Sequence, residues 1–214
     1  TRAIVRRPGQ SFVAAITGSS HLGTVDLGLA LAQHAAYIAA LESAGLSVTV
    51  LPADEAYPDG TFVEDIAVVA PELAVITHPG AATRQGEQHV VEELLADRAI
   101  ERIAPPATLE GGDVMRIGDT FYVGASDRTD EAGIAQFTQI MTGAGYEVRS
   151  IPVAGCLHLK TGVTYIGRNT VVATSEFAGR PEFAGMTVIE VSQADSYACN
   201  WIAINDSLIM PAGY

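Results

Sequence analysis

Two side chains of the 214-residue sequence, Glu110 and His158, have the types that proton transfer needs. Glu110 stands before a Gly-Gly pair at the start of an apolar segment, and His158 stands at the start of a similar segment. A histidine paired with a carboxylate is the standard arrangement for general acid–base catalysis. A lone histidine on a strand is more often a hydrogen-bonded core residue, so the catalytic interpretation depends on the two segments being equivalent.

Three carboxylates, Asp59, Glu64 and Asp65, lie within seven residues. A solvated acidic loop is the ordinary explanation for such a cluster. However, apolar pairs flank Glu64 and Asp65 on both sides, where free surface is not expected, and carboxylates in apolar surroundings need cationic partners. A guanidinium, planar and rich in donors, matches paired carboxylates, and the Phe62 ring could offer its face to the same cation.

Two arginines recur at the ends of such segments. Arg84 and Arg128 each follow a predicted hairpin. Surface ion pairs are the ordinary interpretation of exposed arginines, but the recurrence favours an anchor for a substrate carboxylate. A guanidinium can bind a carboxylate through two parallel hydrogen bonds.

The sequence contains two cysteines, Cys156 and Cys199. Two cysteines do not make a disulfide framework, which is typical of a reducing compartment, and we expect a cytoplasmic protein. Cys156 lies two residues before His158, so an extended segment would place both side chains on one face as a thiolate–imidazole pair. A half-buried structural cysteine is the better interpretation of Cys156, and Cys199 beside Trp201 is expected in the core.

The elements that must position these residues recur along the chain. Residues 108–128 read as a hairpin with a Gly118-Asp119 turn. Similar hairpins are expected to turn at Pro71-Glu72, Gly167-Arg168 and Asn205-Asp206. Because the turns lie about 47, 49 and 38 residues apart, the pattern is typical of a propeller-like or solenoid array of one repeated unit. Each complete unit is a hairpin, a helix and a strand, so polar residues at the same end of each unit converge on one place.

Other elements follow from apolar periodicity and from Gly and Pro punctuation. We expect a strand at 3–5, a mobile loop at 11–23, a helix at 25–44 capped by Thr24, a strand at 46–51, helices near 85–97 and at 130–142, and a helical turn near 181–183. The last hairpin, 201–210, has no helix or closing strand after it. We therefore expect the last unit to be incomplete and the edges at 201–210 and 3–5 to be exposed.

Composition bounds the class of protein and its partners. Hydrophobic residues make up 48% of the sequence and charged residues only 17%, which favours one well-buried domain over residues 1–214. The net charge of −13 argues against nucleic acid and anionic membranes as partners and favours a cationic or neutral small molecule. No apolar run of about 18 residues, and no signal peptide, is recognisable.

Five motifs, in order along the chain, resemble those of the dimethylarginine dimethylaminohydrolases, a family of the guanidino-modifying amidinotransferase superfamily. They are DGTFVED, LEGGDV, SDRTDEAG, LHLKTG and IMPAGY, at 59–65, 109–114, 126–133, 157–162 and 209–214. The resemblance implies an α/β fold, a five-bladed α/β propeller with pseudo-fivefold symmetry, whose last blade is incomplete in this chain. It also implies hydrolysis of Nω-methylated arginine to citrulline and methylamine or dimethylamine, with no metal and no cofactor.

The resemblance also implies a role for individual residues. Glu110 and His158 match the catalytic carboxylate and histidine, and the loop at 11–23 matches a lid. The substrate-binding matches are Glu64 and Asp65 for the guanidinium, Asp59 and Phe62 for other contacts, Arg84 and Arg128 for the carboxylate and amino-acid end, and Thr17, where the family often has Leu. Lys160 favours the dimethylaminohydrolases, because the related arginine deiminases carry Asp at that position.

The family's nucleophile is a cysteine that follows the PAGY motif, so the resemblance places it beyond Tyr214. Neither Cys156 nor Cys199 matches that position, and we expect the 214-residue chain alone to be inactive. Three alternatives stay open: an arginine deiminase-like hydrolase, a non-catalytic guanidino-ligand binder, and an enzyme in which Cys156 is a relocated nucleophile. A homodimer stays open as the assembly.

Overall fold

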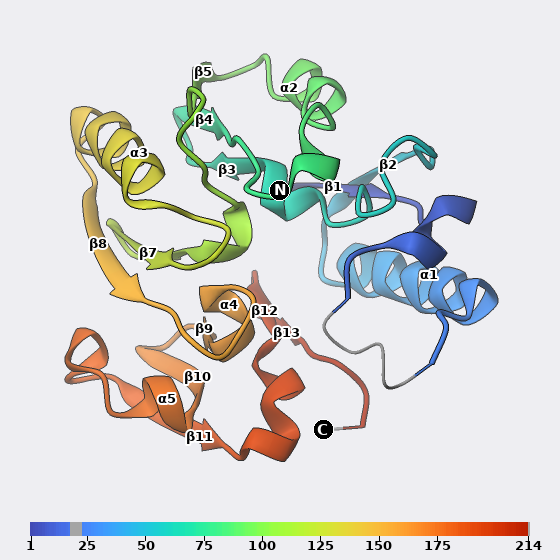
Figure 1. The fold of residues 1–214 in the computed structure, drawn as a ribbon. Coiled ribbons are helices and arrows are strands. Elements are labelled where there is room, and N and C mark those ends of the chain that lie inside the picture. The colour runs from blue at the N-terminus through green and yellow to red at the C-terminus, as the bar shows by residue number, and fades with distance from the viewer. Residues whose placement is uncertain (18–22, 214) are drawn as a thin grey trace.

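Five small sheets surround a common centre in the computed structural model, which describes residues 1–17 and 23–213 (Figure 1). Helices α1 (Leu27–Ser43), α2 (His89–Leu94) and α3 (Glu131–Gly143) lie on the outside of the ring. The one-turn helix α4 (Leu159–Gly162) lies near its centre. This is the propeller-like α/β arrangement that the sequence predicts.

Three of the sheets have the same strand order. In each, two strands form an antiparallel hairpin, and a third strand joins the second one in parallel after a helical segment. The three sets are β3 (Ala67–Val69), β4 (Leu73–Ile76) and β5 (Ala99–Arg102); β6 (Val114–Ile117), β7 (Thr120–Ala125) and β8 (Glu147–Pro152); and β9 (Val163–Tyr165), β10 (Thr170–Thr174) and β11 (Thr187–Val191). The predicted unit of hairpin, helix and strand is therefore confirmed.

The remaining strands form two two-stranded sheets. Strand β1 (Arg2–Arg6) pairs in parallel with β2 (Ser47–Leu51), and β12 (Ile202–Ile204) pairs with β13 (Ser207–Ile209). The short helices are α5 (Ser175–Ala178), η1 (Gln10–Ala14), η3 (Val63–Ile66), η4 (Ala82–Arg84), η5 (Gly111–Asp113), η6 (Pro181–Phe183) and η7 (Gln193–Cys199). Two of them contain predicted site residues: η3 contains Glu64 and Asp65, and η4 contains Arg84. Helix η5 directly follows Glu110.

Helix boundaries depart from the sequence prediction in two places. The cap of α1 is Asp26, whose side chain accepts a hydrogen bond from the backbone N–H of Leu29 at 3.0 Å, so the prediction of Thr24 as the cap is wrong. Helix α2 has six residues instead of the range 85–97. By contrast, α3 lies within one residue of the predicted range 130–142, and Asp130 caps it by accepting from the N–H of Gly133 at 2.7 Å.

The core lies between each outer helix and its sheet. In the unit of β6, β7 and β8, Phe137 and Met141 of α3 are completely buried against Phe121 of β7. The rings of Phe121 and Phe137 meet edge-on with their centroids 5.7 Å apart. Burial of one such side chain stabilises the fold by roughly 1.5–3 kcal/mol. This packing holds each sheet so that its inner end faces the centre of the ring.

The hairpin β12–β13 packs against β1 and α1. Ile204 and Ile209 contact the core cluster that contains Val5 and Leu41, and the side chain of Asn205 donates to the carbonyl of Ala44 at 2.7 Å. The expectation that the apolar faces of both edges would be uncovered is therefore wrong for these residues. No described strand other than β2 pairs with β1.

The predicted loop at 11–23 is only partly described. Its first residues form η1, and residues 18–22 lie outside the described part of the chain. Thr17 is exposed. Among the described residues, no helix has both the length and the apolar character that a membrane crossing requires.

Candidate active site

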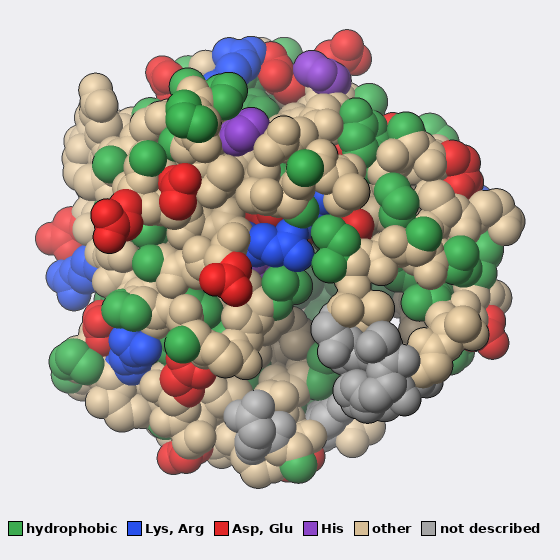
Figure 2. All heavy atoms as spheres, viewed as in Figure 1, with side chains coloured by type: hydrophobic (Ala, Val, Ile, Leu, Met, Phe, Trp, Pro, Cys, Tyr) green, Lys and Arg blue, Asp and Glu red, His purple; other side chains and the backbone are tan. Residues whose placement is uncertain are grey.

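A cavity of about 840 Å³ opens near the centre of the ring. Figure 2 shows this face hollowed near its middle, with acidic, basic and hydrophobic side chains around the hollow. Several predicted site residues line the cavity: Phe62, Glu64, Asp65, Arg84, Glu110, Arg128 and His158. The chain segments before β3, β6 and β9 and the helix η7 all contribute to its wall, as expected if equivalent ends of the units converge.

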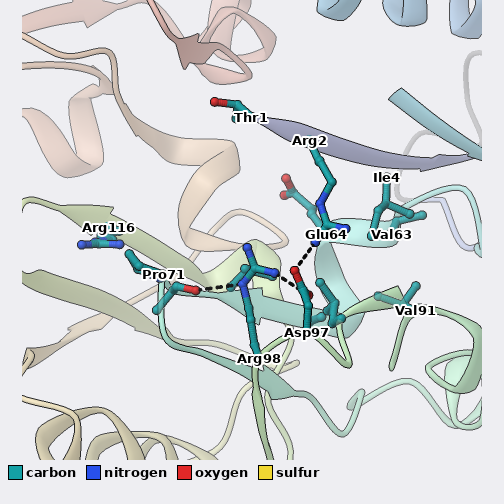
Figure 3. A pocket seen from close by; sticks show the side chains of 14 residues that line it. Thr1, Arg2, Ile4, Val63, Glu64, Pro71, Val91, Asp97, Arg98 and Arg116 are labelled. Atoms are coloured by element: carbon teal, nitrogen blue, oxygen red, sulfur yellow. Dashed lines mark hydrogen bonds and ion pairs between the residues drawn. The ribbon is translucent and has the colours of Figure 1, made fainter. Parts of the chain in front are cut away.

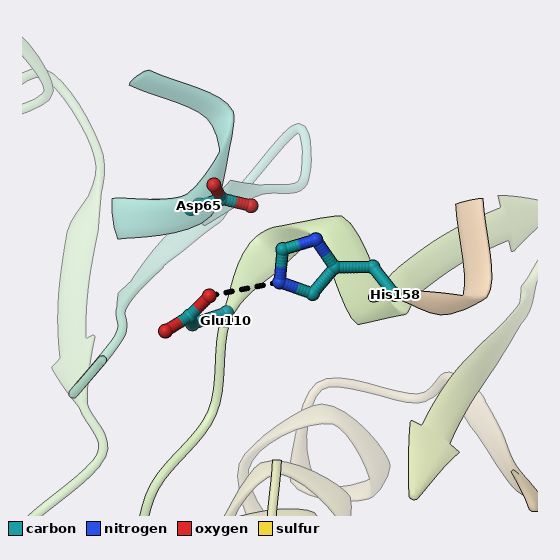
Figure 4. Close-up of side chains that lie close together, drawn as sticks. All are labelled: Asp65, Glu110 and His158. Atoms are coloured by element: carbon teal, nitrogen blue, oxygen red, sulfur yellow. Dashed lines mark hydrogen bonds and ion pairs between the residues drawn. The ribbon is translucent and has the colours of Figure 1, made fainter. Parts of the chain in front are cut away.

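Glu110 and His158 contact each other directly in the wall of the cavity. Glu110 directly precedes η5, and His158 is the cap residue of α4. Nε2 of His158 lies 2.8 Å from Oε2 of Glu110, as the dashed line in Figure 4 shows. A carboxylate only accepts, so Nε2–H is the donor. Glu110 is completely buried and His158 nearly so, which makes this a buried carboxylate–imidazole pair.

The electrostatic surroundings favour the charged forms of both partners. Burial lowers the pKa of His158, but the hydrogen bond to Glu110 and the charges of Asp65 and Asp113 outweigh it, so the pKa is raised above 6.5. For Glu110, burial acts to raise the pKa. The hydrogen bond and charge of His158 and the charges of Arg128 and Arg84 outweigh burial, so the pKa of Glu110 is lowered below 4.5. His158 therefore holds a proton more firmly than a free imidazole, while Glu110 stays ionised.

The Gly-Gly pair after Glu110 allows three chain segments to meet. A Cβ on Gly111 would lie 1.9 Å from the carbonyl oxygen of Glu64. A Cβ on Gly112 would lie 2.6 Å from Nδ1 of His158, and the N–H of Gly112 donates to Oδ1 of Asp65 at 2.9 Å. Only glycine fits both positions, which confirms the expected close approach of the backbone.

Asp65 lies on the side of the imidazole ring that carries Nδ1 (Figure 4). Its Oδ2 accepts a hydrogen bond from Arg84 Nη1 at 2.5 Å, and Arg84 Nε donates to Glu87 at 2.6 Å. Nη2 of Arg84 donates to the carbonyl of Phe62 at 3.0 Å and to that of Asp59 at 3.4 Å. The Arg84 guanidinium thus donates almost all of its hydrogen bonds to protein acceptors, which favours a structural role. The predicted contact of Arg84 with a substrate carboxylate stays a prediction.

The other predicted guanidinium ligands lie in different surroundings. The side chain of Glu64 is 61% exposed and forms an ion pair with Lys160 at 3.4 Å, so the expectation that Glu64 lacks free surface is wrong. Glu64 and Asp65 belong to η3, whose period is near three residues instead of the two of a strand, and of the two only Asp65 is buried. Asp59 is buried and accepts from the N–H of Ile16 at 3.0 Å. Phe62 is 46% exposed, as a ring that meets a ligand would be.

Arg128 contacts the carboxylate oxygen of Glu110 that His158 does not contact. Its Nη1 lies 3.5 Å from Oε1 of Glu110, and its side chain is mostly buried. The backbone N–H of Ala81 also approaches Oε1, at 3.3 Å. Arg128 lines the cavity, as the predicted anchor would, and its contact with a substrate carboxylate stays a prediction.

Neither cysteine has the surroundings of a thiolate nucleophile. Cys156 lines the cavity, but its Sγ donates to the carbonyl of His158 at 3.3 Å, and burial raises the pKa of its thiol. Cys199 is completely buried, and burial raises its pKa to about 11. The segment before His158 is bent, so the extended geometry considered for Cys156 and His158 does not occur. Cys199 lies in the core, as expected.

Among the described residues, Asp65, Glu110 and His158 have ligand atoms within 4.8 Å of one another, a spacing that a metal ion could use. Each of these groups has a protein partner: Nε2 of His158 bonds Glu110, and Asp65 contacts the Arg84 guanidinium. A cation in the position of the shared proton would have to replace the imidazole–carboxylate hydrogen bond. The chemistry of the group therefore fits proton transfer better than metal binding.

A second cavity, of about 750 Å³, lies between β1 and the sheet of β3 and β4 (Figure 3). Asp97 there forms ion pairs with Arg2 at 2.7 Å and with Arg98 at 2.8 Å. Both arginines are thus paired, and of the predicted site residues only Glu64 reaches this cavity. It holds none of the acid–base groups, so the chemistry belongs to the central cavity.

Sequence reasoning missed several residues around the site. Glu87 is buried against Arg84, and Asp113, within the LEGGDV motif, is completely buried. Ser196 and Tyr197 of η7 line the cavity. Asp113 could have been singled out because a carboxylate directly before an apolar strand needs partners, but nothing in the sequence identifies those partners.

Comparison with known proteins decides the family. The family model described as "N,N dimethylarginine dimethylhydrolase, eukaryotic" matches residues 24–208. A protein from Pseudomonas aeruginosa named N(G),N(G)-dimethylarginine dimethylaminohydrolase is 43% identical over 214 residues, which cover 99% of this chain and 84% of that protein. This chain belongs to the dimethylarginine dimethylaminohydrolase family. A further family member, from Streptomyces coelicolor, is 41% identical over 174 residues, or 80% of this chain and 67% of that protein.

Solved structures of the dimethylarginine dimethylaminohydrolase family have the same fold. A cysteine-to-serine variant of the Pseudomonas aeruginosa enzyme in complex with citrulline has a TM-score of 0.96 and 42% identity, and the match covers 100% of this chain and 85% of that one. The N-terminal domain of the cyanobacterial arginine dihydrolase ArgZ matches with a TM-score of 0.83 at 16% identity, over 96% of this chain and 81% of that one. The ArgZ likeness extends to the fold alone.

Proposed function

We propose that this protein hydrolyses Nω-methylated arginine to citrulline and methylamine or dimethylamine. The observation that carries the proposal is the buried Glu110–His158 pair, 2.8 Å apart, at the wall of the central cavity. Family membership supports it, since the curated relatives are named for this reaction and one solved relative holds citrulline.

The cavity suits a cationic amino acid. Asp65 and Glu110 present buried carboxylates, and Glu64 adds an exposed one at the rim. Each oxygen of Asp65 has a single protein donor, from Gly112 or Arg84, and so keeps a lone pair for a guanidinium N–H. Arg128, which contacts Oε1 of Glu110, would bind the carboxylate of the substrate. A methylated guanidinium at Asp65 and a carboxylate at Arg128 match the two ends of methylarginine.

His158 would transfer protons during the reaction. Because Nε2–H donates to Glu110, Nδ1 is the ring atom left for substrate and solvent. The imidazolium protonates the departing amine, and the neutral ring then accepts a proton from the water that hydrolyses the covalent intermediate. Glu110, ionised throughout, orients the ring and stabilises the imidazolium.

The nucleophile in this proposal is a thiolate outside residues 1–214. A thiolate attacks the central guanidino carbon, the C–N bond to the methylated nitrogen breaks, and water then replaces sulfur to give citrulline. The hydrogen bond from Cys156 to the carbonyl of His158 and the high pKa of Cys199 argue against both thiols as the attacking group. This chain covers 84% of the length of the Pseudomonas aeruginosa relative.

The test is citrulline formation from asymmetric dimethylarginine by three forms: the product of the complete gene, the 214-residue chain, and the complete product with Cys156→Ser. We expect activity in the complete product and in its Cys156→Ser variant, and none in the 214-residue chain. Arginine serves as the control substrate, because an arginine deiminase-like enzyme would prefer it. Activity that is lost with Cys156→Ser would make Cys156 the nucleophile, and binding of methylarginine without citrulline in every form would make the protein a ligand binder.

A further inference from the structure

Asp113 is completely buried behind the active site, and its carboxylate accepts three hydrogen bonds. Oδ2 accepts from the hydroxyl of Ser126 at 2.6 Å and from the hydroxyl of Thr129 at 2.7 Å. Oδ1 accepts from the backbone N–H of Leu159 at 2.9 Å. No N–H or O–H of a ligand could reach it, because Gly124, Val153 and Leu159 close the space around it. Asp113 is therefore not a substrate contact.

Each partner of Asp113 leads directly to one residue of the proposed active site. The hydroxyl of Ser126 accepts the backbone N–H of Arg128 at 3.0 Å. The hydroxyl of Thr129 accepts the backbone N–H of Glu110 at 3.1 Å. The third partner, the N–H of Leu159, belongs to the peptide bond that follows His158. One carboxylate thus connects the backbones of the acid–base pair and of the predicted anchor.

The directions of these hydrogen bonds require an acceptor without a donor. Each hydroxyl has one hydrogen, which it gives to Asp113, and each uses a lone pair for a backbone N–H. An asparagine at this position would present an N–H₂ group to at least one partner. In one orientation the N–H₂ group would face the Leu159 N–H, and in the other it would face the two hydroxyls. Either way a buried donor would lose its acceptor, which is costly. Ionised aspartate alone among the common side chains of this size accepts at both oxygens.

We propose that Asp113 is a positioning residue, which sets Glu110, Arg128 and His158 relative to one another through Thr129, Ser126 and the peptide after His158. This inference rests on the function proposed above, since it assigns a part to those three residues. Asp113 itself touches no reacting atom. Its part is to fix the Glu110–His158 hydrogen bond and the distance from that pair to the Arg128 guanidinium, because misplacement of such groups by about 1 Å can cost about 100-fold in rate.

The test separates the branches with three variants of the complete gene product. Thr129→Val cuts the connection to Glu110, Ser126→Ala cuts the connection to Arg128, and Asp113→Asn disturbs all three. The matched control is Asp130→Asn, because Asp130 is a carboxylate nearby that caps α3 and has no contact with the site. The readouts are the pKa of His158 by NMR titration, kcat and KM for dimethylarginine, the affinity for citrulline by calorimetry, and the unfolding temperature.

We expect Thr129→Val to lower the pKa of His158 and to reduce kcat by about tenfold or more with little change in KM. Ser126→Ala should weaken citrulline binding and raise KM while the pKa of His158 stays at the wild-type value. Asp113→Asn should show both effects. Asp130→Asn should lower the unfolding temperature and change neither.

The inference is overturned if the Thr129 and Ser126 variants lose only thermal stability, as the Asp130 variant does. That outcome would make the network purely structural, and it can be read even if Asp113→Asn does not fold. If the wild-type protein forms no citrulline, the proposed function fails, but the His158 titration and the citrulline affinities still decide whether Asp113 positions these residues.

Discussion

Oε2 of Glu110 and Nε2 of His158 lie 2.8 Å apart although 48 residues separate them in the sequence. Glu110 stands directly before the unit of β6, β7 and β8. His158 stands directly before the unit of β9, β10 and β11. Neighbouring units of a ring therefore each supply one half of an acid–base pair. The pair forms only when both units are folded, because neither segment holds both groups.

The first prediction concerns the charge of Glu110. Glu110→Gln should lower the pKa of His158 toward or below 6.5, since the carboxylate is a main reason for the raised value and burial acts in the opposite direction. It should reduce kcat by about 100-fold. An NMR titration of the imidazole and a citrulline assay measure the two effects. Glu147→Gln, at an exposed ion pair with Arg149, is the control and should change neither; an unchanged His158 pKa in Glu110→Gln would contradict the account.

The second prediction concerns Asp65, which contacts the Arg84 guanidinium and faces the cavity. Asp65→Asn should weaken methylarginine binding by about 1.5–3 kcal/mol, which is roughly 10- to 150-fold. It should also lower the unfolding temperature, because the buried Arg84 loses one of its two carboxylate partners. Calorimetric titration and thermal unfolding measure the two losses.

Arg84→Met separates the two parts of this network. If Arg84 acts through Asp65, the double variant Asp65→Asn, Arg84→Met should bind methylarginine no more weakly than Asp65→Asn alone. If Arg84 binds the substrate carboxylate, as the sequence predicts, the two losses should add. Unchanged affinity in Asp65→Asn would remove Asp65 from the guanidinium site.

The third prediction concerns Arg128, whose guanidinium lies beside Glu110. Arg128→Lys should weaken binding of methylarginine but leave binding of methylguanidine nearly unchanged, because methylguanidine has no carboxylate for a two-bonded contact. Calorimetric titration with both ligands measures the difference. Equal losses for the two ligands would show that Arg128 acts only by supporting Glu110.

The fourth prediction concerns pH and stability. The pKa of His158 is raised above 6.5, so its contribution to stability is complete below 6.5 and is lost as pH rises through the folded value. The pKa of Glu110 is lowered below 4.5, so its contribution is complete above 4.5 and is lost as pH falls through the folded value. The wild-type protein should therefore exceed His158→Gln in unfolding temperature most clearly between these two pH values. A difference that does not vary from pH 4 to 9 would contradict the account.

Local signals in the sequence predict the repeated unit. The turns at Gly118 and Asn205 have φ of 60° and 50°, a region that Gly and Asn tolerate, and the cap at Asp130 is equally local. The exact start of α1 is not predictable in this way, since Thr24 and Asp26 are both good caps. Only the packing of α1 on the sheet decides between them.

The site is predictable only where residue type alone indicates the chemistry. Glu110 and His158 are predictable because a carboxylate and an imidazole stand at equivalent places. The exposure of Glu64 is not, because the sequence does not distinguish a short 3₁₀ helix from a strand. The role of Asp113 is not predictable, because tertiary folding brings its partners to it from up to 46 residues away in the sequence. These partners are Ser126, Thr129 and Leu159.

The most direct test of the acid–base account is the rate of citrulline release from dimethylarginine by His158→Gly in the complete gene product, with and without added imidazole. The account predicts a fall of about 100- to 10,000-fold, and a partial recovery when imidazole occupies the space beside Glu110. Asp130→Asn provides the control for a loss of stability. Wild-type rates in His158→Gly, with no response to imidazole, would contradict the assignment of His158 as the proton-transfer group.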